Sequence, residues 1–496
     1  MTESKTYLGH FVVGGADHAG QLVIDGRRSS LEIYGEEFLH IPDQEMKRVI
    51  GVARDGQSIT CVNCVGVEVA GSTNYYGNRR HFLSLFPNRV LIGPRHLDPR
   101  EKEIVKLTFC FTKANMLFYD WGTFGHIIYE HPLSYGQKRE ILQYVRKSPR
   151  RRRRGGRLDL YFHWDREPII EVKTALGTIT AHTDAGYQCT ATDGLNLQGQ
   201  VRVHVKFSSP QELDEVLRIQ FIIMEFFEFV AQGRQNLTHI EVAHKDGDQE
   251  APLLLFLSHD QNDEVDSLEP TDALVNGGIH SEEFERMLKA WLETHDSRSG
   301  ARRRFVDGFR SGGSYSADRL VGAANAFDLL PAGDFGSART PSPDVEALIS
   351  AIKTDIDKAA TSSKDIAEYR ERLRNALGSA RRSGLRSKIL ACYADLPADL
   401  KKRLPEMEWL VGHCVRARNF FVHGTEEKMT ADQVYSHATF FTDTLEFIFA
   451  AYELKKCGWD VVRWLGESFS RSRLKWYIRN YKHHLALLKE TIGGSA

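Results

Sequence analysis

The sequence has few of the features that mark secreted or membrane proteins. Its seven cysteines are scattered along 496 residues, and an odd, dispersed set favours a reducing compartment over a disulfide framework. The first 20 residues lack a basic start followed by an apolar core, so we expect no signal peptide. The most apolar run, residues 217–230, contains Glu225 and Glu228 and is too short to span a bilayer. We therefore expect a cytoplasmic protein with no membrane partner.

An excess of charge of either sign is also missing. The chain carries 65 lysines and arginines against 66 acidic residues, for a formal net charge of -1. Any surface that binds nucleic acid must therefore be a local patch. The densest candidate is the run of arginines at residues 150–154, which would either bind phosphates through counterion release or form a solvated loop. A smaller run, Arg302, Arg303 and Arg304, would line the same path or face water.

Complete metal-binding patterns are absent as well. Cys61 and Cys64 have the spacing of half a zinc site, but a structural zinc needs four ligands, and no second pair accompanies them. In a regular strand these two side chains would also point to opposite faces. The neighbouring His413 and Cys414 lack a carboxylate or second cysteine at suitable spacing. We predict that Cys61 and Cys64 are ordinary strand cysteines, that His413 packs in the interior or supports the residues of the nearby motif, and that no metal is bound.

The first half of the chain has the pattern of a β-rich domain. Short runs rich in Val, Ile, Tyr and Phe recur between Gly, Asp and Asn residues, which predicts strands. One helix, expected at residues 210–231, follows a Ser-Ser-Pro start signal. We predict an antiparallel, sandwich-like domain at residues 1–259. Its expected strands are residues 7–13, 21–24, 30–34, 59–69, 104–112, 158–162, 169–174, 177–180, 201–207 and 253–257.

The second half changes to a helical pattern. Residues 260–278 are acidic, contain Asn, Gly and Pro, and are predicted to be a linker. Apolar residues then recur at helical spacing, which predicts an all-α bundle at residues 279–496. The fold class is thus α+β, with a β-rich domain followed by a helical one. The expected helices are residues 282–292, 315–329, 345–360, 366–377, 385–393, 401–422 (broken near Pro405), 432–454 and 461–488.

The residues best suited to chemistry lie near the end of one predicted helix. Arg418, Asn419 and His423 fall within six residues, and Gly424 follows as a plausible C-cap. Asn419 and His423 are i,i+4 neighbours, and Arg416 lies on the same stripe one turn earlier. Cleavage of RNA without a metal needs a base for the ribose 2′-OH, an acid for the leaving 5′-oxygen and a cation on the phosphate. Histidine can be base or acid, and arginine grips phosphate oxygens.

One copy of this motif offers a single histidine. Two copies that face each other would supply both the base and the acid, so we expect a symmetric homodimer or a higher oligomer. The arrangement Arg418-Asn419-x-x-x-His423 resembles the signature of HEPN-domain ribonucleases, in which an arginine and a polar residue precede a histidine by a few positions. A β-rich half before a C-terminal HEPN half resembles the ApeA family of bacterial anti-phage proteins.

This resemblance implies an abortive-infection endoribonuclease that is silent until a phage-encoded trigger activates it, with tRNA as the substrate, cut at the anticodon loop. It implies metal-independent transesterification with no cofactor, leaving 2′,3′-cyclic phosphate and 5′-hydroxyl ends. His423 would be the base or acid, Arg418 would hold the scissile phosphate, and Asn419 would orient one of them. Arg416 would be an auxiliary cation. The trigger, and how the β-rich half responds to it, are not predicted.

Two other functions stay open. A non-catalytic HEPN-like module would bind RNA or a partner protein and leave RNA intact. Asp159, followed by Glu171 and Lys173, resembles the sparse pattern of PD-(D/E)xK nucleases, in which carboxylates hold a divalent cation and the lysine stabilises the attacked phosphate. The same residues would equally suit an exposed strand with charged positions on its outer face.

Overall fold

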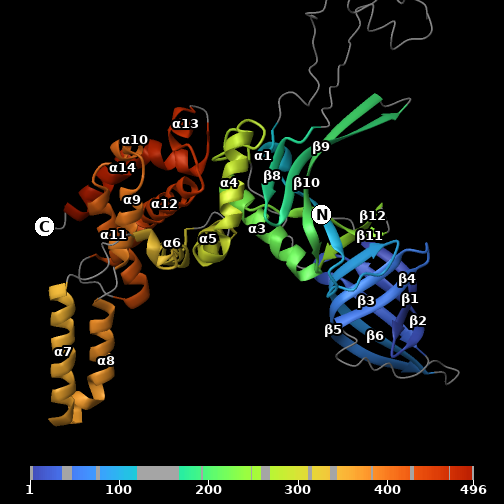
Figure 1. Cartoon of the computed structure of the whole chain (residues 1–496), viewed down its shortest axis with the longest axis horizontal. Coiled ribbons are helices and arrows are strands. Elements are labelled where there is room, and N and C mark those ends of the chain that lie inside the picture. Colours follow the sequence, from blue (N-terminus) through green and yellow to red (C-terminus); the bar gives the residue numbers. More distant parts are fainter. Residues whose placement is uncertain are drawn as a thin grey trace, which may run out of the picture.

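Figure 1 shows the computed structural model of the chain, in which a β-rich half and a helical half lie side by side. The predicted strand at residues 158–162, Asp159 and the arginine run at residues 150–154 lie outside the residues that the structure describes. Among the helices of the described ranges, none has an apolar stretch of the length that a bilayer requires. These ranges are 4–35, 47–73, 79–119, 167–190, 194–246, 249–258, 268–310, 315–335, 343–362, 364–380, 384–424, 429–467 and 470–493.

The first six strands close into an antiparallel barrel. Their order around the barrel is β3 (Ser30–Gly35), β2 (Ala16–Ile24), β1 (Lys5–Val13), β4 (Arg48–Ala53), β5 (Ser58–Thr73) and β6 (Arg79–Gly93). The barrel closes because β6 also pairs with β3, with Leu31 opposite Leu85. Alternate side chains point inward and form a buried cluster that includes Phe11, Leu22, Leu31, Ile33, Ile59, Leu85 and Ile92.

Beyond the barrel the same sheet continues as an open extension. From β6 the order runs through β12 (Gln249–Leu257), β11 (Leu237–Asp246), β7 (Ile104–Phe111), β10 (Gly194–Gln211), β9 (Gly177–Thr190) and β8 (Ile170–Thr174), with every pairing antiparallel. Helix α3 (Leu213–Ala231) packs on this extension, and its Phe227 ring stacks on Phe111 of β7 at 5.1 Å between centroids. Two short elements, η1 (Gly26–Arg28) and α1 (Ala114–Leu117), connect strands.

The helical half is organised around one long buried helix, α12. Its residues from Phe440 to Leu454 are all buried, and its first turn has a capping box between Thr430 and Gln433. The remaining helices surround it or extend from it. The elements are α4 (Ser281–Glu293), α5 (His295–Arg310), α6 (Ala317–Asp328), η3 (Ala332–Phe335), α7 (Pro343–Ser362), α8 (Lys364–Ala380), α9 (Leu385–Ala394), α10 (Ala398–Arg403), α11 (Met407–His423), α12 (Ala431–Lys456), α13 (Val461–Gly466) and α14 (Arg473–Gly493).

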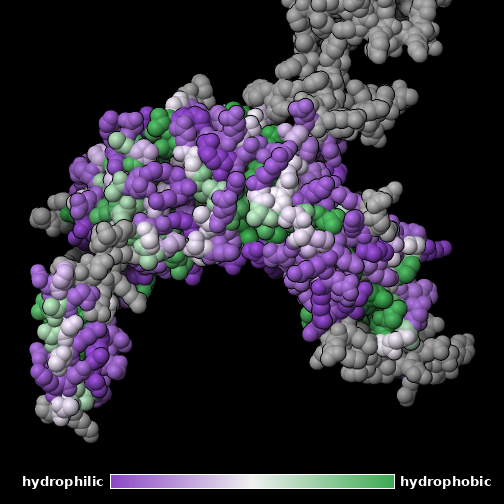
Figure 2. Space-filling model, in the orientation of Figure 1, coloured by the Kyte–Doolittle hydropathy of each residue, from purple (hydrophilic) through white to green (hydrophobic). Residues whose placement is uncertain are grey.

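Helices α7 and α8 form a hairpin that projects away from the rest of the helical half (Figure 1). Figure 2 shows that the visible surface is largely hydrophilic, with apolar side chains gathered in small patches, some of them along this hairpin. The exposed apolar side chains there include Val345, Leu348, Ile352, Tyr369 and Leu373.

One hydrophobic core joins the open sheet to the helical half. The Phe229 ring of α3 packs against the Phe305 ring of α5, with 4.5 Å between the ring centroids. The Phe305 ring in turn packs against the Phe449 ring of α12, at 5.2 Å between centroids. The core also includes Leu268, Leu274 and neighbouring buried residues, which lie within the segment predicted as a linker. The division into domains stays a prediction, but the described part of that segment contributes to the core.

The predicted α+β class, with a β-rich part before a helical part, is confirmed. The sandwich-like form proves to be a closed barrel with an open extension. Strands β4, β6 and β11 were not predicted, and the helical stretch expected around residues 302–304 had no predicted bounds, because Gly, Pro or charged residues interrupt these apolar patterns. The break near Pro405 is present between α10 and α11, whereas the single helix expected at residues 461–488 is two helices, α13 and α14.

Two expectations about individual residues were wrong. Cys61 and Cys64 do not point to opposite faces: both lie in the barrel core, because Asn63 between them has a left-handed backbone (φ 52°) that breaks the strand alternation. Arg302 does not face water: it is fully buried, and its guanidinium donates to Glu453 at 3.0 Å. Its neighbours Arg303 and Arg304 are exposed.

Candidate active site at the end of helix α11

The predicted helix end at Gly424 is confirmed. Helix α11 finishes at His423, and Gly424 adopts a left-handed conformation (φ 66°) with its N–H donating to the carbonyl oxygen of Phe420 at 2.8 Å. Glycine is favoured there because it has no Cβ to strain a positive φ. The cap ends the helix directly after His423, so the imidazole lies on the surface at the helix terminus, where it is exposed.

Arg418 is held in place by two amide side chains. Its Nη1 donates to Oδ1 of Asn419 at 3.1 Å, and its Nη2 donates to Oδ1 of Asn325 on helix α6 at 3.1 Å. Its Nε is buried and makes no hydrogen bond with any residue that the structure describes. Both acceptors are neutral, so they fix the direction of the guanidinium without cancelling its charge. The positive charge remains available for a phosphate.

Asn325 was not identified from the sequence. It lies 93 positions before Arg418, and nothing in its local pattern distinguishes it from other polar residues on an amphipathic helix. Only the packing of α6 against α11 brings the two side chains together. Asn325 could be identified from the sequence only if the face of α6 that contacts the motif helix were already known.

His423 and Arg416 are the exposed members of the motif. Neither makes a hydrogen bond or ion pair with the parts of the chain that the structure describes. Arg418 and His423 are five residues apart, so their Cα atoms are offset by about 7.5 Å along the helix axis. A single copy therefore presents one imidazole and the guanidinium groups of Arg416 and Arg418 near the same helix end. Asn419 lies between Arg418 and His423 in sequence and is hydrogen-bonded to Arg418.

Aromatic rings form a surface beside the motif. Phe421 lies 5.5 Å from both Phe420 and Tyr435, measured between ring centroids. Tyr435 belongs to the start of α12 and is 65% exposed, and Val422 is also exposed. An exposed aromatic ring such as Tyr435 can stack on unpaired bases or contact a second protein surface. Tyr435 was not identified as a site residue from the sequence, because its pattern indicates only one position of an apolar-rich helix.

His413 and Cys414 are both buried in the helical half. The His413 ring lies 4.3 Å from Trp409 between centroids, and burial, followed by the charge of Arg416, lowers the pKa of His413 to about 4. The thiol of Cys414 is fully buried beside the Phe441 carbonyl oxygen, and burial raises its pKa. Among the described residues, no group of three or more His, Cys, Asp or Glu side chains is arranged to hold a metal ion.

The residues of the alternative nuclease pattern are only partly placed. Glu171 and Lys173 lie on the same outward face of strand β8 and pair with each other at 3.1 Å, with the lysine side chain 80% exposed. Asp159 lies outside the described residues. The described pair alone has the arrangement of an exposed strand with charged outer positions.

Two family models match the chain. Residues 7–291 match the model described as ApeA N-terminal domain 1, and residues 321–462 match the model described as Apea-like HEPN. The second match contains Asn325 and the whole of helix α11, including Arg418, Asn419 and His423. No curated protein and no solved structure matches the chain.

Proposed function

Because the chain belongs to the ApeA family, whose C-terminal part is an Apea-like HEPN domain, we propose that it is an endoribonuclease that cleaves RNA without a metal ion. At the family level, the matches support an anti-phage HEPN nuclease. The main support for RNA cleavage without a metal ion is the geometry of the motif on α11. Arg418 is held by two uncharged oxygens, and the exposed imidazole of His423 ends the same helix.

The proposed reaction uses these side chains in separate roles. Arg418 binds the scissile phosphate and offsets the negative charge that develops on its oxygens. One imidazole removes the proton of the ribose 2′-OH, the 2′-oxygen attacks phosphorus, and the bond to the 5′-oxygen breaks as a second imidazole protonates it. The products are a 2′,3′-cyclic phosphate and a 5′-hydroxyl. Asn419 orients Arg418, and Arg416 is a second cation near the substrate.

A dimer would supply the second imidazole. Two copies related by a twofold axis would each present Arg418 and His423 to a shared phosphodiester. The half-buried rings of Phe420 and Phe421 and the exposed ring of Tyr435 lie beside the motif, and Tyr435 suits contact with a partner copy or with splayed bases. Aromatic residues are enriched in both kinds of interface.

The substrate we propose is an unpaired RNA loop, specifically the anticodon loop of tRNA. A flexible single strand can place its 2′-oxygen in line with the leaving oxygen, which a duplex does not allow. We propose that the enzyme acts in the cytoplasm and is activated by a phage-encoded trigger through the β-rich half. The six cysteines whose side chains the structure describes are free and buried, which suits a reducing compartment.

One assay tests the proposal. Purified protein is incubated with total tRNA, with and without EDTA, and the ends of the products are mapped. We expect cleavage that EDTA does not affect, with cyclic phosphate ends. His423→Ala and Arg418→Ala should each abolish cleavage while the protein stays folded by circular dichroism. Matched controls are the exposed His483→Ala on α14 and Arg372→Ala on α8, which should cleave at the wild-type rate.

The same assay separates the alternatives. If a well-folded His423→Ala protein cleaves tRNA fully, the proposed site is wrong. RNA that is bound but left intact by the wild type would indicate a binding module. Activity that disappears in EDTA and survives His423→Ala would indicate the metal nuclease of Asp159, Glu171 and Lys173.

A further inference from the structure

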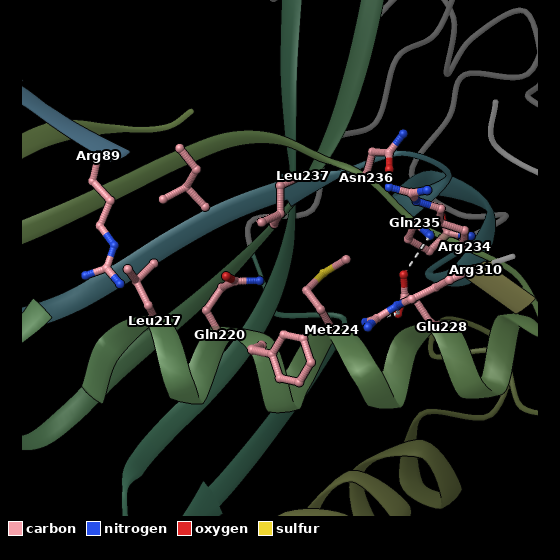
Figure 3. A pocket seen from close by; sticks show the side chains of 12 residues that line it. Arg89, Leu217, Gln220, Met224, Glu228, Arg234, Gln235, Asn236, Leu237 and Arg310 are labelled. Atoms are coloured by element: carbon pink, nitrogen blue, oxygen red, sulfur yellow. Dashed lines mark hydrogen bonds and ion pairs between the residues drawn. The ribbon is translucent and has the colours of Figure 1, made fainter. Parts of the chain in front are cut away.

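The described part of the chain contains a cavity far in sequence from the motif helix. It lies between α3 and the strands beside it, at the point where the end of α5 reaches the β-rich half (Figure 3). Its volume is about 430 Å³, which is within the range of small-molecule sites. Its lining residues are Arg89, Leu217, Gln220, Phe221, Met224, Glu228, Arg234, Gln235, Asn236, Leu237, Leu257 and Arg310.

A buried amide in this cavity has no protein partner. Gln220 is only 5% exposed, and its side chain points from α3 into the cavity (Figure 3). It makes no hydrogen bond with another residue that the structure describes. Its amide atoms are open to the cavity, so a ligand bound there would supply the hydrogen bonds that the protein does not.

A cation in the same cavity is also unpaired. Arg234 is half-buried and forms no ion pair or hydrogen bond within the described ranges. The other two arginines differ: Arg310 donates twice to Glu228, at 3.1 and 2.7 Å, and Arg89 pairs with Asp214. The carboxylate of Glu228 interacts with the charges of both Arg310 and Arg234, so these two arginines and one carboxylate leave one net positive charge at this end. An arginine in such a setting suits a phosphate.

The spacing of these groups limits the size of the ligand. In Figure 3, Arg234, Arg310 and Glu228 gather at one end of the cavity, while Gln220 lies further along α3. Gln220 and Glu228 are eight residues apart on one helix, which corresponds to about 12 Å along its axis. Met224 lies between them and offers an apolar, polarizable surface. Inorganic phosphate alone is too small to reach both ends.

We propose that this cavity binds a nucleoside monophosphate. The phosphate lies on Arg234, the heterocyclic base hydrogen-bonds to the amide of Gln220, and the body of the ligand covers Met224. A bound nucleotide would touch both halves of the molecule, because Arg310 belongs to α5, beyond the end of the N-terminal family match at residue 291. The proposal does not depend on the ribonuclease assignment, and the cavity shares no residue with the motif helix.

Isothermal titration calorimetry on the full chain tests the proposal. The probes are AMP, GMP, CMP and UMP, each compared with its nucleoside and with inorganic phosphate. We expect at least one monophosphate to bind more tightly than both of its parts. Arg234→Met and Gln220→Met should each weaken binding by about tenfold or more, the usual effect of losing one charge-assisted or buried hydrogen bond. The control Arg218→Met changes an exposed arginine on the same helix and should bind normally.

The variants also separate binding from folding. Gln220→Met keeps the side-chain volume and removes an unpaired amide, so the melting temperature of the free protein should not fall. If Gln220→Met nevertheless unfolds, Arg234→Met, at a half-buried position, still carries the test. The proposal is overturned if none of the four monophosphates binds, if inorganic phosphate binds as tightly as the nucleotide, or if neither variant weakens binding. The motif variant His423→Ala should bind the nucleotide like the wild type.

Discussion

The guanidinium of Arg418 is held in one direction by groups that do not neutralise its charge. The amide oxygens of Asn419 and Asn325 fix where the guanidinium points, and because they are neutral they leave its charge unpaired. A carboxylate in either place would hold the arginine more strongly but would compete with the phosphate. The geometry is therefore suited to a residue that must be both positioned and electrostatically active.

Asn325 should behave as a positioning residue. Asn325→Ala removes one acceptor of Arg418 and should lower kcat for RNA cleavage by about ten- to a hundredfold, the range of one charge-assisted hydrogen bond. Asn325→Asp keeps the acceptor but adds a negative charge, so it should chiefly raise KM. The measurement is steady-state cleavage of a fluorescent RNA loop. A wild-type kcat in Asn325→Ala would exclude a positioning role.

His413 should make the protein sensitive to acid. Its pKa in the folded state is lowered to about 4 from an ordinary value of 6.5. Between these values the unfolded chain binds the proton and the folded one does not, so stability is full above pH 6.5 and falls as the pH drops toward 4. The loss attributable to this group is about 3 kcal/mol.

His413→Gln tests that prediction. The variant has no proton to take up at this position, so its free energy of unfolding in urea should fall less between pH 7 and pH 4.5 than that of the wild type. His204 and His295 also have pKa values lowered to about 4 by burial, but they contribute equally to both proteins. Parallel pH profiles would show that His413 does not contribute.

Helix α12 is largely buried and carries acidic side chains. Its three buried carboxylates are paired with arginines from the helices packed around it: Glu453 with Arg298 and Arg302 of α5, Glu446 with Arg319 of α6 and Arg473 of α14, and Asp443 with Arg473. Buried charges are tolerated when they are paired and hydrogen-bonded. These pairs link α5, α6 and α14 to the helix at the centre of the helical half.

Breaking one of these pairs should be costly. Glu453→Gln leaves Arg302, which is fully buried, without its carboxylate, and such a loss destabilises a protein by about 3–5 kcal/mol. The matched control is Asp357→Asn on the projecting hairpin, where the carboxylate also holds two arginines, Arg370 and Arg374, but at the surface. Exposed pairs contribute little, so its melting temperature should hardly change.

Thermal unfolding followed by circular dichroism compares the two variants. The expected order is a large decrease in melting temperature for Glu453→Gln and almost none for Asp357→Asn. Equal decreases would mean that burial does not determine the contribution of these ion pairs.

The β-rich half and the helical half share one hydrophobic core. The contacts from Phe229 through Phe305 to Phe449 run from the open sheet to the centre of the helical half. A packed interior transmits displacement because it has few voids to absorb it. A trigger that acts on the β-rich half would therefore act on helices that are packed against it, and α6, which holds Arg418 through Asn325, packs against both α5 and α12.

The proposed dimer makes a quantitative prediction. Wild type and His423→Ala are mixed in equal amounts, subunits are allowed to exchange, and RNA cleavage is measured at constant total protein. If the shared site needs both histidines, activity should fall to about one quarter of the wild-type value, because only that fraction of dimers has two wild-type copies. A pull-down of the tagged variant checks that exchange has occurred. Activity near one half would show that each copy cleaves RNA alone.

Local sequence determined much of this protein. The helical spacing of apolar residues predicted most of the helices, the glycine after His423 predicted the end of α11, and the alternating runs predicted most strands. The motif itself was visible because Arg418, Asn419 and His423 are close in sequence, and its likeness to HEPN proteins agrees with the family match. These features are encoded within a few neighbouring residues, so reading the chain is enough to find them.

Tertiary structure alone decided the contacts between distant segments. Closure of the barrel depends on β3 meeting β6, the burial of Arg302 depends on Glu453, and the position of Arg418 depends on Asn325. The unpaired Gln220 became visible only when α3 and the strands beside it enclosed a cavity. No local pattern contains this information, because the partner of each side chain is set by how whole elements pack around the core.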